Sequence, residues 1–220
     1  FGQAVNYTAL GAIEYILNDN DLAFYNIRKS IEINKKIGNA RGLGIAFHLL
    51  GTTEFLAQNY DLAVAALSES LRWRELSNDI PGKTLTHVAL GKVFLWVNEF
   101  DKASRHFLEA EKTLTKKNNL NRAEFFYNQG RFFLLTKKND EARNRFEQSL
   151  EIYREIGNKN GEALALLEMS RVTEQIGNRM LALEYARSSL DIIEQARLEI
   201  LDYRRRLNFF AAVQPFYEYS

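Results

Sequence analysis

The stretch LGTTEFLAQNYDLA, residues 50–63, contains the pattern on which the whole chain is built: a glycine, Gly51, followed twelve residues later by an alanine, Ala63. A small residue and an alanine with this spacing recur at offsets of 40, 40, 39 and 40 residues. The five pairs are Gly11 and Ala23, Gly51 and Ala63, Gly91 and Ala103, Gly130 and Ala142, and Ser170 and Ala182. A fixed period in this range predicts a solenoid, in which each repeat buries its apolar face against its neighbours.

The small residues predict two helices that cross closely within each repeat. Glycine inside a helix costs roughly 0.5–1 kcal/mol, and a close crossing offsets that cost. Four residues after each alanine, at helical spacing, the chain carries Ile27, Leu67, Phe107, Phe146 and Ala186. We predict helices at about 3–17, 21–37, 41–57, 61–77, 81–97, 101–117, 121–136, 140–156 and 160–176, and from 179 onward.

Helix ends recur with the same period. Fifteen residues after the first four alanines come Gly38, Asn78, Asn118 and Gly157, residue types that tolerate a left-handed C-terminal cap. The next positions hold Asn39, Asp79, Asn119 and Asn158, which we expect to be N-caps. In the fifth repeat these two places hold Arg197 and Leu198, so we expect the last helix to continue.

This pattern resembles the tetratricopeptide (TPR) repeat over about residues 1–197. The resemblance implies an all-α fold: a right-handed α-solenoid of five TPR helix pairs plus a C-terminal capping helix. We expect repeats at about 1–38, 39–78, 79–118, 119–157 and 158–197, with a capping or linker helix at 198–220. The 40-residue period, with IGN at 37–39 and 156–158, is similar to that of kinesin light chains and polarity adaptors. Glu14, Glu54 and Ser170 depart from the family pattern.

Composition limits the classes of function. A formal net charge of +1 argues against nucleic acid as a partner, and the run Arg204–Arg206 is interpreted as a solvated helix face. The chain has no cysteine, which excludes disulfides and thiolate chemistry. No signal peptide or long apolar run is present, so we expect a cytoplasmic protein with no membrane partner. The first residue, Phe1, suggests a fragment of a longer protein.

No residue pattern predicts catalysis. His48, His87 and His106 lack the spacing that would place two of them on one helix face, so no metal site is expected. Trp73 and Trp96 are interpreted as core or groove-edge aromatics. We therefore predict a non-enzyme with no cofactor and no catalytic residues. A hydrolase with an undetected active site is the rival from another class.

The TPR resemblance implies that the first helix of each repeat lines a concave groove. Its ligand contacts would lie three and two residues before the small anchor and one residue after it. The candidate peptide-binding residues are His48, Thr52, Lys92, Tyr127, Asn128, Arg131, Glu168 and Arg171. Asn128 matches an asparagine that such repeats use to bind a ligand main chain. The row of Lys92, Arg131 and Arg171 predicts an acidic protein or peptide segment as partner, although Glu168 offsets part of its charge.

Residues 201–219 resemble the segment that joins TPR arrays to a CHAT domain, a caspase-like protease fold, in bacterial and especially cyanobacterial proteins. Arg206, Phe209, Phe210, Ala211, Val213, Gln214, Tyr217 and Glu218 fit that pattern, whereas Pro215 departs from it. The sequence therefore predicts a protein-interaction scaffold from a larger CHAT-containing protein, with a downstream CHAT domain as a further partner. The alternatives are a receptor for a small signalling peptide and a kinesin-light-chain-like adaptor.

Overall fold

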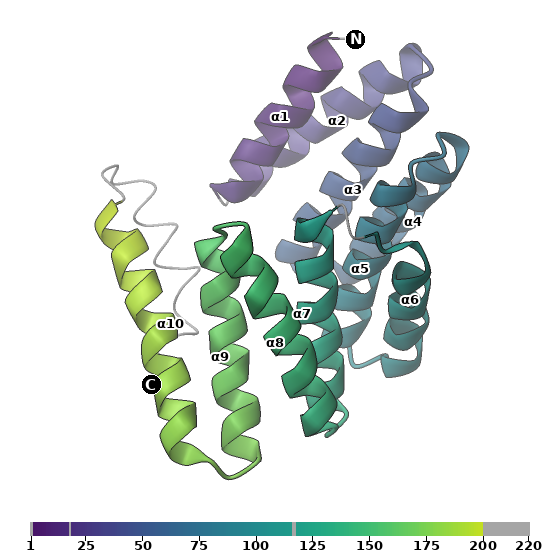
Figure 1. The fold of residues 1–220 in the computed structure, drawn as a ribbon. Helices are drawn as coiled ribbons and strands as arrows, with labels where there is room; N and C mark the ends of the chain where they lie inside the picture. Colours follow the sequence, from purple (N-terminus) through teal and green to yellow (C-terminus); the bar gives the residue numbers. More distant parts are fainter. Residues whose placement is uncertain (1, 18, 116–117, 200–220) are drawn as a thin grey trace. The chain divides into compact units, whose positions relative to one another are not determined.

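The computed structural model describes residues 2–17, 19–115 and 118–199, and these fold into α-helices joined by short turns (Figure 1). The helices are α1 (Gly2–Ile16), α2 (Asn20–Lys36), α3 (Ala40–Leu56), α4 (Tyr60–Leu76), α5 (Ile80–Trp96), α6 (Phe100–Thr113), α7 (Asn119–Leu135), α8 (Asn139–Glu155), α9 (Lys159–Gln175) and α10 (Arg179–Glu199). Most predicted bounds agree with these to within one or two residues. The exception is α6, which ends four residues earlier than expected.

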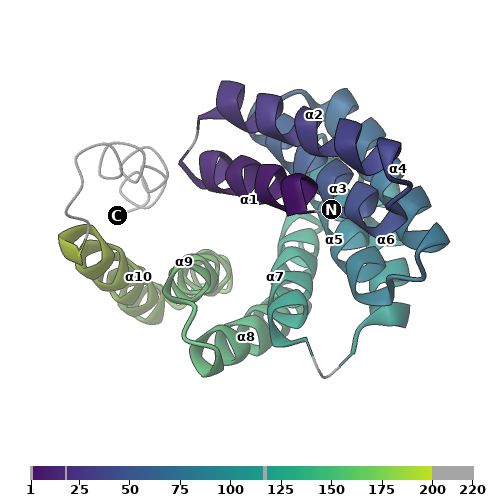
Figure 2. The same ribbon diagram turned by 90° about the horizontal axis from the view of Figure 1, so that it is seen from above.

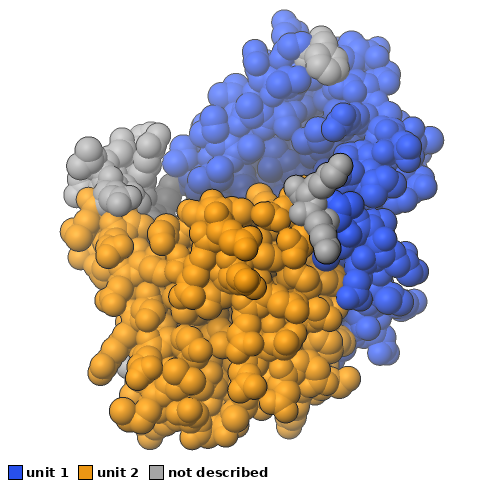
Figure 3. Space-filling model, in the orientation of Figure 1, with its two compact units in different colours: residues 1–115 blue, residues 116–220 orange. Residues whose placement is uncertain are grey.

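The chain divides into two compact units, residues 1–115 and residues 116–220 (Figure 3). Unit 1 holds the first three repeats, α1–α6, and unit 2 holds the last two, α7–α10. In each unit the helices pack in sequence order, and the first helices of neighbouring repeats, such as α1 and α3 or α7 and α9, also touch (Figure 2). Each unit is therefore a stack of helical hairpins.

The predicted close crossing lies at the centre of every hairpin. The five anchor alanines are at most 5% exposed. A Cβ placed on Gly51 would lie 2.6 Å from Leu67 Cγ and 3.0 Å from the carbonyl oxygen of Ala63. On Gly130 it would lie 2.7 Å from the ring of Phe146. The residue four positions after the alanine thus packs directly on the glycine, as the spacing predicted.

The fifth hairpin solves the same contact differently. Ser170 replaces glycine, and the facing residue is the small Ala186 instead of an aromatic or branched side chain. The Ser170 hydroxyl donates a hydrogen bond of 2.8 Å to the carbonyl of Ala182. The exchange of volume between the two helices keeps the crossing filled.

A buried serine, which the sequence analysis did not predict, ties the two helices of four hairpins together. Its hydroxyl donates to a carbonyl near the start of the first helix, from Ser30 to Ala4, Ser70 to Gly44, Ser149 to Ala123 and Ser189 to Ala163, at 2.7–3.1 Å. All four serines are fully buried. A buried hydroxyl needs such a partner, so these bonds satisfy groups that would otherwise cost stability.

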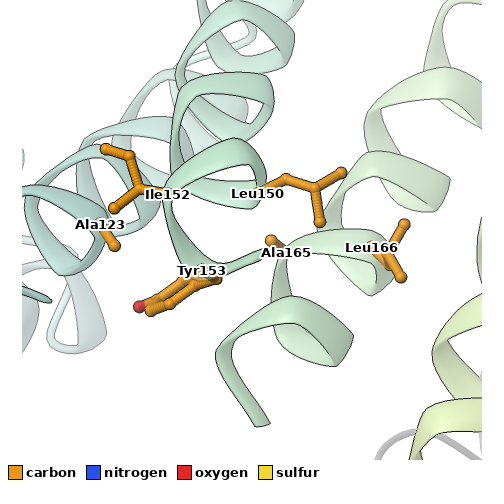
Figure 4. Packing of buried hydrophobic residues seen from close by; sticks show 6 residues of the cluster. All are labelled: Ala123, Leu150, Ile152, Tyr153, Ala165 and Leu166. Atoms are coloured by element: carbon orange, nitrogen blue, oxygen red, sulfur yellow. The ribbon is translucent and has the colours of Figure 1, made fainter. Parts of the chain in front are cut away.

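A glycine near the start of a following helix makes room for the end of the preceding one. Gly42, Gly82 and Gly161 each leave space for a side chain from the previous repeat, which is Asn34, Arg74 and Tyr153 respectively. In unit 2 the Tyr153 ring belongs to a core cluster in which α8 packs between α7 and α9 (Figure 4). The cluster contains Ala123, Leu150, Ile152, Tyr153, Ala165 and Leu166.

Helix caps agree with the prediction at three of four places. Gly38, Asn78 and Gly157 have φ of 64°, 52° and 66°. Side chains of the next residues accept from backbone N–H groups: Asn39 from Gly42, Asp79 from Gly82 and Asn158 from Gly161. These bonds satisfy N–H groups that have no partner within the helix.

The prediction was wrong for Asn118 and Asn119. Asn118, with φ of −113°, is the N-cap of α7 and accepts from the N–H of Asn121, while Asn119 is the first helical residue. Each N-cap lies twelve residues before the next small anchor, at 39, 79, 118 and 158. The repeat spacing of 39 residues therefore lacks the residue before the cap, and counting forward from Ala103 misplaced it.

A second set of left-handed residues lies in the turn inside each hairpin, seven residues after the small anchor. Gln58, Asn98, Lys137 and Gly177 have φ of 63°, 60°, 60° and 96°. Glutamine and lysine are unfavourable there because their Cβ atoms crowd the backbone. The sequence analysis missed these positions since only Asn98 and Gly177 carry residues typical of the conformation.

The last helix continues as predicted. α10 runs through Arg197 and Leu198 to Glu199, without a cap at the place where the earlier repeats have one. The expected capping or linker helix beyond it, and the residues that resemble the CHAT-associated segment, lie outside the described residues.

Candidate functional site

In unit 1 the predicted groove residues of α3 bond mostly within the protein. His48 Nδ1 lies 3.2 Å from Thr86 Oγ1 of α5. Burial, with a smaller effect of the Arg74 charge, lowers the pKa of His48 to about 3, so its imidazole is neutral at pH 7. The Thr52 hydroxyl donates to the carbonyls of His48 and Leu49 in its own helix.

Lys92 lies beside an aromatic group on α3 and α5. Its ammonium is 4.8 Å from the centroid of the Phe55 ring, and Phe55 makes an edge contact with Trp96 at 5.9 Å. Trp96 is 54% exposed, so it belongs to the surface and not to the core. A cation beside exposed aromatic rings can contact a partner through both charge and apolar area.

A pocket of about 530 Å³ lies at the start of unit 1, between α1 and α3. Its lining contains the apolar groove positions that the TPR resemblance implied for the first repeat. The lining residues are Ala4, Val5, Thr8, Ala9, Ala12, Asn34, Asn39, Arg41, Gly42 and Ile45. Val5 and Ile45 are 52% and 42% exposed, so an apolar wall faces the solvent there.

In unit 2 four of the predicted residues meet at one carboxylate oxygen. Glu168 Oε1 accepts hydrogen bonds from Arg171 at 3.2 Å and from the Tyr127 hydroxyl at 3.4 Å, and it lies 3.6 Å from Arg131 Nε. The Glu168 side chain is only 5% exposed, while the two arginines are 23% and 35% exposed. A buried carboxylate needs such partners, because desolvation without pairing is costly.

Tyr127 serves this cluster as a neutral donor. Burial, followed by the nearby Glu168 charge, raises its pKa above the usual value, so the phenol keeps its proton. Glu168 therefore fixes the direction of two arginines and one hydroxyl on α7 and α9.

The cluster opens into a pocket of about 350 Å³. Its lining combines charged groups with apolar side chains of α7, namely Arg131, Leu134, Leu135, Glu168, Arg171, Glu174 and Gln175. Leu135, 47% exposed, and Gln175 lie one helical turn after the predicted positions 131 and 171. The sequence analysis missed this second row, although residues four apart share a helix face.

Asn128 is placed differently from an amide that faces a ligand. It is 6% exposed, and its Nδ2 donates to the Glu124 carbonyl in the same helix at 2.8 Å. Its Oδ1 is buried without a hydrogen-bond partner. In this structure the side chain therefore belongs to the helix packing.

Within residues 2–17, 19–115 and 118–199, no group of three or more histidine, cysteine, aspartate or glutamate side chains is arranged to hold a metal ion. In the same part of the chain no helix combines the length and apolar character needed to cross a bilayer.

Comparison with known families identifies the repeat. Residues 121–195 match the tetratricopeptide repeat. The match covers α7–α10, the helices that carry the Glu168 cluster. No curated protein matches the chain.

Solved structures show the same fold over most of the chain. BtubC (BKLC) from P. vanneervenii is 15% identical, with a TM-score of 0.70 over 89% of this chain and 81% of that one. PilF of Pseudomonas aeruginosa is 19% identical, with a TM-score of 0.65 over 100% and 94% of the two chains. A putative kinesin light chain of Podosopora anserina with TPR-like repeats is 14% identical, with a TM-score of 0.61 over 88% and 96%. The fold is thus the predicted all-α solenoid of TPR helix pairs.

Proposed function

We propose that this chain is a non-catalytic protein–protein interaction scaffold, and that a partner segment binds on α7 and α9 beside Arg131, Glu168 and Arg171. TPR proteins typically act as scaffolds of this kind. The observation that carries the proposal is the 350 Å³ pocket in which two arginines share one buried carboxylate.

The pocket suits a segment that combines an acidic with an apolar side chain. A guanidinium has five N–H donors, so an arginine that contacts Glu168 keeps others for an incoming carboxylate. Because Glu168 already orients the arginines, a ligand would not have to order them, which reduces the entropic cost of binding. Leu134 and Leu135 offer an apolar wall for the neighbouring side chain of the ligand.

The remaining predicted residues have graded roles in this proposal. Lys92, beside Phe55 and Trp96, is a second contact point on unit 1 for an acidic and apolar segment. Tyr127 orients Glu168. His48, Thr52 and Asn128 shape the helix surface through bonds inside the protein.

We further propose that the scaffold is the recruitment region of a larger CHAT-containing protein. This proposal rests on the pattern in residues 201–219 and on nothing in the helices. It is tested by the reading frame that follows residue 220, in which a histidine and cysteine pair at the spacing of a caspase-like domain is expected. A frame that continues without such a domain would rule out this context while leaving the scaffold proposal intact.

Binding can be tested with a random peptide library displayed on phage and selected on the immobilised protein. We expect enrichment of peptides that carry Asp or Glu next to Leu, Ile or Phe. Synthetic copies of these peptides should bind Arg131→Gln/Arg171→Gln at least about tenfold more weakly, since a hydrogen bond to a charged group is worth about 1.5–3 kcal/mol. Binding should also weaken with added salt.

The matched control is Arg143→Gln/Arg187→Gln, which removes the same charge from exposed positions on α8 and α10. It should leave peptide affinity unchanged. If the two double variants lose affinity equally, the effect is one of net charge and the assigned surface is wrong. Selected peptides without acidic residues would also contradict the proposal.

A further inference from the structure

The third repeat contains a pair of histidines that the proposed scaffold function does not use. His87 on α5 and His106 on α6 face each other, with 3.1 Å between their Nδ1 atoms. Their ring centroids are 5.4 Å apart and the ring planes are inclined by 36°. The other face of His106 stacks on Phe94, which fixes the orientation of that ring.

The repeat architecture does not require histidine at these places. The same positions hold Phe47 and Ala66 in the second repeat, and Phe126 and Arg145 in the fourth. In the fourth repeat the Arg145 guanidinium lies 5.4 Å from the Phe126 ring, an ordinary packing contact. The pair in the third repeat therefore adds a chemistry that packing alone does not explain.

The separation of the two nitrogens suits a shared metal ion. Zinc–imidazole bonds are about 2.0–2.1 Å long, and tetrahedral geometry then places two ligand nitrogens about 3.3 Å apart. The observed 3.1 Å needs only a small opening of the pair. Neutral imidazole is a good ligand for Zn²⁺, Ni²⁺ and Cu²⁺.

We propose that His87 and His106 form a binding site for a divalent transition-metal ion, with Zn²⁺ as the probe, in which Nδ1 of each ring is a ligand. Glu109 is the third donor. It lies three residues after His106, on the same face of α6, and its charge interacts with both imidazoles. Water completes the coordination.

Glu109 must turn away from its present partner to reach the ion. It now pairs with Lys112 at 2.6 Å, and both side chains are about half exposed. Exposed pairs of this kind contribute little stability, so the exchange is inexpensive. Other charges near the site are Lys83, which pairs with Glu75, and Arg105.

The proton balance of this step is simple. In the free pair one Nδ1–H donates to the other Nδ1, so one ring has its proton on Nδ1 and the other on Nε2. In the complex both rings carry it on Nε2, and the ion displaces bound water only. Binding should therefore release no proton near pH 7.5, and its enthalpy should not depend on the ionisation enthalpy of the buffer.

The composition makes the experiment specific, because the chain has no cysteine and only one further histidine, His48. Calorimetric titration of ZnCl₂ should give one bound ion per chain. A free Zn²⁺ concentration tenfold above Kd should raise the Tm of the cooperative transition that contains the pair by about 3–6 °C. Mg²⁺, which prefers oxygen ligands, should leave Tm unchanged.

Three variants separate the assigned site from adventitious binding. His87→Gln and His106→Gln should each abolish the Zn²⁺-dependent rise in Tm, whereas His48→Gln should retain it. Retention of the rise in the His87→Gln/His106→Gln double variant, or its loss in His48→Gln, would overturn the assignment. So would the absence of any Zn²⁺ binding by the unaltered chain at about 0.2 mM, a concentration at which a Kd of 1 mM or weaker corresponds to at most about 4 kcal/mol.

A measurement on the unaltered chain does not depend on whether the variants fold. In ¹⁵N-detected imidazole spectra, saturating Zn²⁺ should shift the Nδ1 resonances of two histidines together and leave the third in place. Shifts of the Nε2 resonances instead, or of one histidine alone, would show that the ion does not lie between the two rings.

Discussion

The second and third repeats place different residues at equivalent positions, and the difference explains why their second helices end differently. In the second repeat, Ser70 on α4 donates to the Gly44 carbonyl on α3. In the third, the serine position holds Ala110, and the hydroxyl lies instead on the facing helix, at Thr84. Thr84 Oγ1 is 2.8 Å from Thr113 Oγ1, the last residue of α6.

The ends of these repeats differ accordingly. α4 has 17 residues, and its Arg74 enters the space beside Gly82 and forms a buried ion pair with Asp79 at 2.8 Å. α6 has 14 residues, and Leu114, which follows it, has extended backbone angles. The position equivalent to Gly82 is then Asn121. The glycine thus coincides with a full-length preceding helix, and its replacement coincides with a helix that stops a turn earlier.

Removing Asp79 should have the largest effect on this comparison. Asp79→Ala would leave the buried Arg74 charge unpaired and also remove the N-cap of α5, so we expect a loss of about 3–5 kcal/mol in the free energy of unfolding. Urea denaturation would measure it. Asp79→Asn keeps the cap acceptor and should recover about 1 kcal/mol of the loss. Equal stability of Asp79→Ala and the unaltered chain would show that the ion pair does not hold this junction.

Acidification should distinguish the two units, because all three histidines lie in unit 1. The folded-state pKa of His48 is lowered from 6.5 to about 3, so the unfolded chain binds more protons below pH 6.5 and stability falls as the pH decreases. Lowering the pH from 6.5 to 5 should cost about 2 kcal/mol through His48 alone. Urea unfolding of His48→Gln at both pH values should show a correspondingly smaller loss.

A methyl group on the junction glycine of unit 2 should test whether the space it leaves matters. Gly161→Ala would place a Cβ against the Tyr153 ring, which must shift. We expect a net loss of about 1–2 kcal/mol, even though alanine favours helix by up to about 1 kcal/mol. Gly2→Ala, where a Cβ meets nothing within 4 Å, is the matched control and should not destabilise the chain.

The smallest expected effect is a gain in stability at the turns inside the hairpins. Gln58→Gly in unit 1 and Lys137→Gly in unit 2 relieve a left-handed conformation at equivalent positions. Each should raise the free energy of unfolding by up to about 1 kcal/mol, as read from thermal melts. The same change at Asn98 should give less, since asparagine tolerates this conformation. A loss of stability at residue 58 or 137 would mean that the replaced side chain contributes packing that outweighs the backbone strain.

The candidate site shows where prediction from sequence reached its limit. The position after each small anchor correctly placed Arg131 and Arg171 beside one pocket, because a helix face follows from spacing alone. The burial of Glu168 beneath both arginines, and that of Asn128 within its own helix, depend on what the adjacent helix brings to the same point. Those neighbours come from a different repeat, so local spacing carries no information about them.

The sequence by itself determined the helix pairs, the glycine–alanine crossings and most of the caps, because these depend on spacing, small residues and backbone conformations within one repeat. The tertiary structure alone decided which side chains meet between helices. The Arg74–Asp79 pair, the Glu168 cluster and the contact of His87 with His106 all belong to this group. The physical reason is that each contact joins residues whose separation is set by helix packing, and a period of about 40 residues fixes the order of the helices but not the partners of their side chains.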